Sequence, residues 1–338
     1  MSRRRDPGWR DEAAAALMAR RLPRLSLRGR ALVLGDPRSE VADALTREGL
    51  EVRSWWRRGG AGRQATVWPD EGACEVAALR LPRAKDELEM TVHAAAAQLE
   101  VGGTLLVYGA KDEGIGSAAR RIEPVFGSVR SLATGGHCRI LAATRPDRIA
   151  GHRPGLEDWR LEGPLELDEI SGPWVSYPGV FAHGRVDRGT RMLLDTLPPL
   201  ASGDRVLDFG CGSGIVAAVA RARTPDLAVD CLDVDAVALA AARENVPGAR
   251  FILGDGLGAV SDPGYDWILS NPPYHTGKAE SLTTVRDLVS RSPAALARGG
   301  RLIMVVQRRL PAEEMLAATF DHVRRLAANA TYRVWEAY

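Results

Sequence analysis

The sequence predicts an α/β fold of two tandem, Rossmann-like, doubly wound domains, the first of them degenerate. The length of 338 residues suits about two domains. Apolar, strand-like runs alternate with helical stretches in both halves, which favours mainly parallel sheets with helices on both faces. The halves also repeat each other. Residues 99–107 and 296–304 both contain a helix end, a Gly-Gly turn and an apolar strand. Residues 31–37 parallel 206–210 in the same way.

Residues 1–26 are rich in arginine and are expected to form a segment ahead of the first domain. A second basic group is interleaved with Trp55 and Trp56. Arginine beside exposed aromatic side chains suits phosphate contact and base stacking, so both groups are candidates for RNA contact. A solvated arginine-rich surface is an equally good interpretation. The arginines concerned are Arg3, Arg4, Arg5, Arg10, Arg20, Arg21, Arg24, Arg28, Arg30, Arg53, Arg57, Arg58 and Arg63.

The first domain, expected over residues 27–145, has the strands of the repeat without a ligand-binding loop. Gly35 follows its first strand, but the next residues are 36–38, Asp-Pro-Arg, and not further glycines. Residues 81–84, Leu-Pro-Arg-Ala, stand where the second half has Asn-Pro-Pro-Tyr at 271–274. We therefore expect the first domain to be non-catalytic.

The domain boundary is expected within residues 146–173, which are rich in proline, glycine and charge and predict a linker. The second domain is then expected over residues 174–338. Its last element is predicted to be a strand at residues 331–335.

The second domain opens with a strand at 205–209, a glycine-rich turn and a helix start. Gly210, Gly212 and Gly214 allow positive φ and a close approach of the backbone to a ligand. The helix N-terminus that follows favours a negative group. The spacing Gly-x-Gly-x-Gly differs from the dinucleotide pattern Gly-x-Gly-x-x-Gly. Asp208, which precedes the turn, is awkward for a pyrophosphate but suits the ammonium group of S-adenosylmethionine (SAM).

Two further acids follow at positions that suit a nucleoside. Asp233 ends the next predicted strand, 227–233, where an acid accepts hydrogen bonds from both ribose hydroxyls. Asp255 follows a third strand and is placed to accept from an adenine amine. A single aspartate is more often a solvated loop residue or a helix cap, and Asp235 is expected to cap the helix at 237–242. The order and spacing of the acids together favour SAM binding.

A stiff loop follows the apolar run 267–269. Pro272 and Pro273 fix two φ angles and remove two backbone donors. The loop therefore presents the side-chain oxygen of Asn271 and nearby carbonyl oxygens, with the ring of Tyr274 beside them. Two acceptors suit the two N–H groups of a planar amine, and Tyr274 suits stacking on the attached ring. Taken alone, four such residues could also be a turn that closes a strand.

These motifs carry a family resemblance. Residues 174–310 resemble class I SAM-dependent methyltransferases of the Asn-Pro-Pro-Tyr group, which methylate exocyclic or amide nitrogens. The segments 177–181 (Tyr-Pro-Gly-Val-Phe) and 187–190 (Asp-x-Gly-Thr) are similar to two-domain ribosomal RNA guanine-N2 methyltransferases, small-subunit rRNA methyltransferase C among them. The resemblance implies that Phe181 approaches the cofactor and that the N-terminal domain is a degenerate copy. It implies 16S rRNA more than 23S rRNA as substrate.

The predicted reaction is methyl transfer from SAM to the N2 amine of a guanine in rRNA, with Asn271, Pro272 and Tyr274 as catalytic residues. Pro273 and Tyr274 are expected to contact the base. Adenine N6 or a release-factor glutamine stays open as the acceptor, because the loop alone does not separate these amines. The duplicated N-terminal half argues against the release-factor enzymes. An RNA-binding protein without activity is disfavoured because the cofactor and loop motifs are intact.

Composition limits the remaining possibilities. The formal net charge of +2 excludes a general polycation. Four widely spaced cysteines form no Cys-x-x-Cys pair and no histidine has a ligand pattern, so no metal is expected. Cys211 and Cys231 are expected to be buried thiols. No apolar run has the length of a signal or membrane segment, so we expect a cytoplasmic protein. The resemblance implies rRNA or a ribosomal subunit as its partner, and we expect a monomer.

Overall fold

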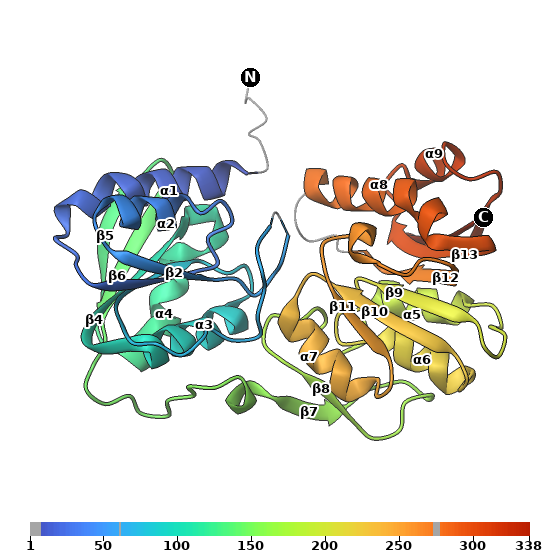
Figure 1. Cartoon of the computed structure of the whole chain (residues 1–338), viewed down its shortest axis with the longest axis horizontal. Coiled ribbons are helices and arrows are strands. Elements are labelled where there is room, and N and C mark those ends of the chain that lie inside the picture. The colour runs from blue at the N-terminus through green and yellow to red at the C-terminus, as the bar shows by residue number, and fades with distance from the viewer. Residues whose placement is uncertain (1–7, 61, 273–277) are drawn as a thin grey trace. The chain divides into compact units, whose positions relative to one another are not determined.

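The computed structural model describes residues 8–60, 62–272 and 278–338. The chain folds into two compact units, each with a central sheet and flanking helices (Figure 1). The predicted α/β fold class is confirmed. Unit 1 comprises Met1–Arg57 and Thr66–Trp159, and unit 2 comprises Arg58–Ala65 and Arg160–Tyr338.

Unit 1 contains a six-stranded sheet with the order β2-β1-β3-β4-β6-β5. The strands β1 to β4 pair in parallel, and β5 and β6 add an antiparallel edge. The strands are β1 (Arg30–Leu34), β2 (Glu51–Trp55), β3 (Cys74–Arg80), β4 (Leu99–Ala110), β5 (Val129–Gly135) and β6 (Cys138–Thr144). The helices are α1 (Trp9–Arg21), η1 (Leu22–Arg24), α2 (Glu40–Arg47), α3 (Lys85–Gln98), η2 (Lys111–Glu113), α4 (Ile115–Phe126) and η3 (Glu157–Trp159).

Two cores lie on the two faces of this sheet, because successive strand side chains point to opposite faces. Val33 packs with α1 and α2, whereas the next residue, Leu34, packs with α3 and α4. The start of α2 is stabilised by Asp36, whose Oδ2 accepts from the backbone N–H of Val41 at 2.8 Å.

Part of the arginine-rich N-terminal segment is helical. α1 lies within residues 1–26 and belongs to unit 1, because its Met18 is fully buried against the sheet. Trp55 is only 5% exposed, so its interpretation as an exposed stacking platform is wrong. Arg57 is 3% exposed and forms an ion pair with Glu87 at 3.8 Å, so this arginine is also internal. Apolar burial and charge pairing inside unit 1 decide both positions.

Unit 2 contains a seven-stranded sheet with the order β11-β10-β9-β12-β13-β15-β14. The strands β9 to β13 pair in parallel, and β15 pairs antiparallel with both β13 and β14. The strands are β9 (Arg205–Phe209), β10 (Ala228–Asp233), β11 (Arg250–Leu253), β12 (Tyr265–Ser270), β13 (Leu296–Gln307), β14 (Val323–Ala328) and β15 (Tyr332–Ala337). The helices are α5 (Arg188–Thr196), α6 (Ile215–Arg223), α7 (Ala236–Asn245), η4 (Leu257–Ala259), α8 (Lys278–Ala295) and α9 (Ala312–Ala317).

The two faces of this second sheet are covered by different helices. Val206 packs with α5, α6 and α7, and Leu207 packs with η4, α8 and α9. The predicted final strand is confirmed as β15. The expected linker, 146–173, is partly regular: its second half contains β7 (Leu161–Pro164), which pairs with β8 (Pro173–Ser176) inside unit 2.

Candidate active site

The glycine-rich turn after β9 has positive φ at all three glycines: +70° at Gly210, +55° at Gly212 and +89° at Gly214. A Cβ on Gly210 would meet nothing within 4 Å, and one on Gly212 would come no nearer than 4.0 Å to Phe181 Cβ. A Cβ on Gly214 would lie 2.6 Å from Val246 Cγ2. Gly210 and Gly212 therefore border open space beside the half-exposed Phe181, whereas Gly214 has a packing role at the start of α6.

Two carboxyl groups flank this turn in environments that favour protonation. Asp208 is 1% exposed, and burial raises its pKa to about 7, although its Oδ2 accepts from the N–H of Ala217 at 3.0 Å. Burial, and then the charge of Asp235, raise the pKa of Asp233 to about 6. Asp233 Oδ2 accepts from the N–H of Gly212 at 2.8 Å. Across the described part of the chain, no cationic side chain pairs with Asp208.

A segment far away in the sequence lies against the same strand ends. Arg58 forms an ion pair with Asp235 at 3.3 Å, and Gly59 donates its N–H to the carbonyl of Val234 at 2.8 Å. Gly60, at φ +105°, is so close that a Cβ on it would lie 2.7 Å from Asp255 Oδ2. The sequence analysis did not predict these contacts of residues 58–60, because no local pattern links them to unit 2.

Asn271 follows β12, whose last residue, Ser270, is fully buried and donates its hydroxyl to the carbonyl of Phe209 at 2.9 Å. The Asn271 Nδ2 donates to Thr190 Oγ1 at 2.8 Å and to Asp187 Oδ2 at 3.3 Å. The Asn271 Oδ1 is buried and accepts no hydrogen bond from the described residues. An unsatisfied buried acceptor costs about 1–3 kcal/mol, which a ligand N–H would recover.

Only part of the predicted substrate loop can be placed. Pro272 is buried beside Asn271. The predicted residues Pro273 and Tyr274 lie outside the described residues. The sequence singled out the segment 187–190 only through its similarity to the family. In the structure this segment starts α5 and contacts the side chain of Asn271.

The structure brings the predicted site residues to one edge of the unit 2 sheet. Asp208, Asp233, Asp255 and Asn271 lie at or just after the C-terminal ends of β9, β10, β11 and β12, which are parallel neighbours. Ligands of open α/β sheets bind at this edge. The open space beside Gly210 and the buried carboxyl group without a cation fit the amino-acid end of SAM.

Residues 173–336 match the family model described as methyltransferase small domain, and residues 17–159 match methyltransferase small domain N-terminal. A protein from Pseudomonas syringae pv. tomato named ribosomal RNA small subunit methyltransferase C is 33% identical over 328 residues, which are 91% of this chain and 94% of the relative. The protein of the same name from Hahella chejuensis is 30% identical over 328 residues, covering 92% and 94%. This chain belongs to the small-subunit ribosomal RNA methyltransferase C family.

A solved structure supports the same fold. The T. thermophilus 16S rRNA N2 G1207 methyltransferase, in complex with AdoMet (SAM) and guanosine, superposes with a TM-score of 0.80 at 22% identity and covers 99% of this chain and 92% of its own. The predicted family, fold class and SAM-dependent rRNA methyltransferase class are confirmed. Among the described residues, no helix is long and apolar enough to cross a membrane and no acidic, histidine or cysteine cluster could hold a metal.

The same edge of the unit 1 sheet is occupied by charged side chains. Strand register pairs Leu34 with Leu79 in unit 1 and Phe209 with Ser270 in unit 2. Leu79 of β3 therefore corresponds to Ser270 of β12. The residue after each also corresponds, so Asn271 of unit 2 matches Arg80 of unit 1 and not Leu81. This shifts by one residue the equivalence that we expected from the sequence.

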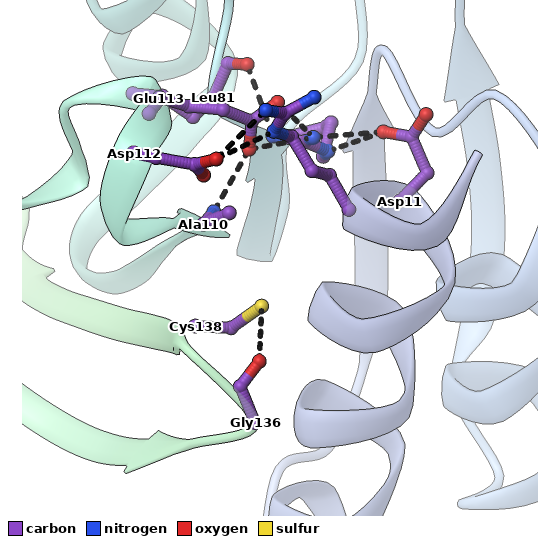
Figure 2. A network of polar contacts seen from close by, with 9 residues as sticks. Asp11, Leu81, Ala110, Asp112, Glu113, Gly136 and Cys138 are labelled. Carbon is purple, nitrogen blue, oxygen red and sulfur yellow. Dashed lines mark hydrogen bonds and ion pairs between the residues drawn. The ribbon is translucent and has the colours of Figure 1, made fainter. Parts of the chain in front are cut away.

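Arg80 is 7% exposed and lies in a polar network with Asp11 and Glu113. Figure 2 shows these two acids on opposite sides of the network. Arg80 Nε donates to Asp11 Oδ1 at 2.8 Å, and its Nη2 donates to Glu113 Oε1 at 2.7 Å. Glu113 also accepts from the N–H of Ala110 at 2.8 Å. An arginine held by two acids offers donors where Asn271 offers an acceptor, so unit 1 lacks the chemistry of unit 2 at this position.

Proposed function

We propose that this chain transfers the methyl group of SAM to the N2 amine of a guanine in the rRNA of the small ribosomal subunit. The observation that carries this proposal is the buried, unpartnered Oδ1 of Asn271 at the strand edge that also holds the glycine turn. The relatives are named for the small-subunit rRNA, and the T. thermophilus structure is named for N2 of G1207. The corresponding guanine is the acceptor that we propose.

The cofactor-binding roles follow from the placement of each side chain. Asp208 accepts from the ammonium of SAM, and the backbone at Gly210 and Gly212 borders its amino-acid end. Asp233 keeps free lone pairs for the ribose hydroxyls, and Asp255 accepts from the adenine amine. Phe181 contributes apolar surface beside Gly212. Gly214 supports the turn through packing on Val246.

The reaction is a direct displacement in which the sulfonium of SAM would supply the methyl group, its methyl C–S bond breaking so that the rest of the cofactor leaves as a neutral thioether. The guanine is turned out of its stack, and Tyr274 and Pro273 contact the base. Asn271 Oδ1 and the Pro272 carbonyl accept the two N2 hydrogens, which turns the nitrogen lone pair out of conjugation and towards the methyl carbon. As the N–C bond forms, the nitrogen gains positive charge and then releases one proton to water. Alignment supplies most of the acceleration.

The proposed partner is the small ribosomal subunit or its 16S rRNA, acted on by a monomer in the cytoplasm. Adenine N6 and a release-factor glutamine would suit the same two acceptors. The names of the relatives favour rRNA over a release factor. The name of the T. thermophilus structure favours guanine N2 over adenine N6.

The test is methyl transfer from isotope-labelled SAM to small subunits, large subunits, naked 16S rRNA and a release factor, each without the modification. We expect label in 16S rRNA that digests to N2-methylguanosine. Asn271→Ala should lower kcat by at least about a hundredfold with little change in SAM affinity by calorimetry. Label on adenine or on the release factor would overturn the substrate, and equal losses of kcat and SAM affinity would overturn the role of Asn271.

A further inference from the structure

We infer that Asp187 and Thr190 are positioning residues that fix the side-chain amide of Asn271 so that its Oδ1 alone faces the methyl acceptor. The inference rests on the proposed function and goes beyond it, because neither residue has been assigned a role in the reaction. Both contact Asn271 through the same atom, Nδ2, at 3.3 Å and 2.8 Å.

The hydrogen-bond inventory of the amide leaves one orientation. A primary amide has two N–H donors on nitrogen and an acceptor on oxygen. Asp187 Oδ2 and Thr190 Oγ1 use both donors of Asn271, and its Oδ1 accepts nothing from the described residues. Rotating the amide by half a turn would set Oδ1 against the Asp187 carboxylate, where two acceptors repel. It would also aim two donors at an amine that has only donors to offer.

The position of Asp187 is itself fixed by the backbone. Its Oδ2 accepts from the N–H of Gly189 at 2.8 Å and of Thr190 at 3.4 Å, which caps α5. α5 is anchored by Leu193 and Leu194, both buried in the unit 2 core. The space is tight, since a Cβ on Gly189 would lie 2.9 Å from Asp187 Oδ2 and 3.4 Å from Asn271 Oδ1. The helix cap and the orientation of Asn271 therefore share one carboxylate.

The same carboxylate should strengthen the acceptor. A hydrogen bond from Nδ2 to a charged oxygen polarises the amide and makes its Oδ1 more negative. The methyl acceptor becomes more positive as the N–C bond forms, so this polarisation stabilises the transition state more than the bound ground state. Removing either partner should then lower kcat and leave SAM affinity unchanged.

The test compares Thr190 variants in the full-length protein. Thr190→Val removes the acceptor with little change of shape, and Thr190→Ser keeps it. Thr196→Val is the matched control, because Thr196 lies on the same helix and donates its hydroxyl to the carbonyl of Met192 at 2.9 Å, away from Asn271. We expect Thr190→Val to lower kcat roughly ten- to a hundredfold, by analogy with the loss of partners that orient metal ligands. Thr190→Ser and Thr196→Val should retain wild-type kcat.

A double-mutant cycle separates positioning from simple support of the fold. If Thr190 acts through Asn271, Thr190→Val should have no further effect on the residual rate of Asn271→Ala. An additive loss, a parallel loss of SAM affinity, or failure of Thr190→Ser to retain activity would overturn the inference. If the wild-type protein labels a different amine, the proposed substrate fails. The Thr190 comparison on that amine still decides the positioning role.

Discussion

Alanine substitutions at three glycines of unit 2 should separate three effects: backbone strain, steric overlap at a helix start, and obstruction of the proposed cofactor site. Gly203, Gly210 and Gly214 all have positive φ, at +86°, +70° and +89°. Alanine at any of them incurs the cost of a left-handed backbone, about 1–2 kcal/mol. The surroundings differ, because a Cβ would meet nothing within 4 Å at Gly203 and Gly210 but would lie 2.6 Å from Val246 Cγ2 at Gly214.

The packing clash should separate Gly214 from the other two in stability. Overpacking adds about 1–3 kcal/mol, so Gly214→Ala should lower the free energy of unfolding by about 2–5 kcal/mol in total. For a unit of this size the Tm falls about 2–4 °C per kcal/mol, which predicts a decrease of roughly 4–20 °C. Gly203→Ala and Gly210→Ala should each lower Tm by only about 2–8 °C.

Cofactor binding should separate Gly210 from Gly203. The space beside Gly210 borders the proposed position of SAM, so an added methyl group should raise the Kd for SAM at least about tenfold, or ~1.4 kcal/mol. Gly203→Ala carries the same backbone strain without this contact and should bind SAM as the wild type does. Thermal unfolding without ligand and calorimetric titration with SAM measure the two effects. Wild-type affinity in Gly210→Ala, or equal Tm losses at Gly203 and Gly214, would refute the reasoning.

Further outcomes concern pH and the unit 1 network. Because the folded-state pKa values of Asp208 (about 7) and Asp233 (about 6) lie above the ordinary value of 3.8, the folded protein binds more protons than the unfolded chain between about pH 4 and 7. Their contribution to ligand-free stability should therefore decrease as pH rises through this window. Asp208→Asn removes one of the two groups and should flatten the dependence of Tm on pH. An unchanged slope would contradict the burial of the Asp208 charge. SAM affinity should rise over the same window, since the ammonium prefers ionised Asp208, and calorimetry at several pH values checks it. Arg80→Met should destabilise the protein by about 3 kcal/mol, because it leaves Asp11 and Glu113 without their cation. Denaturant unfolding measures this loss. A free energy of unfolding equal to that of the wild type would show that the network makes no net contribution to stability.

Local signals in the sequence were sufficient for several features. Asp235 was expected to cap the following helix, and its Oδ1 accepts from the N–H of Val237 at 2.9 Å. Cys211 and Cys231 were expected to be buried thiols, and both are. The final strand was also placed correctly. Each feature depends on the types and spacing of a few neighbouring residues. A strand, a turn or a helix start needs the same local pattern wherever it lies in the fold.

Other features depended on segments far apart in the sequence. Trp55 was expected at the surface, but it is buried and its Nε1 donates to the carbonyl of Thr66 at 3.2 Å. Leu81 was expected to correspond to Asn271, but strand register assigns this position to Arg80. The register of the strands, and not the similarity of short motifs, aligns the two sheets. Burial and register both arise from long-range pairing, which no local pattern encodes.

The sequence by itself determined the duplicated α/β architecture and the positions of the proposed SAM-binding motifs and of the proposed reactive loop at Asn271, because these require particular residue types at fixed local spacings. Only the tertiary structure decided how the side chain of Asn271 is held, since Asp187 and Thr190 are more than eighty residues away along the chain and meet it at the sheet edge. It also decided that Arg58 and Gly60 lie against Asp235 and Asp255. Such contacts exist only once the parallel strands pair, because pairing brings their C-terminal ends to one edge.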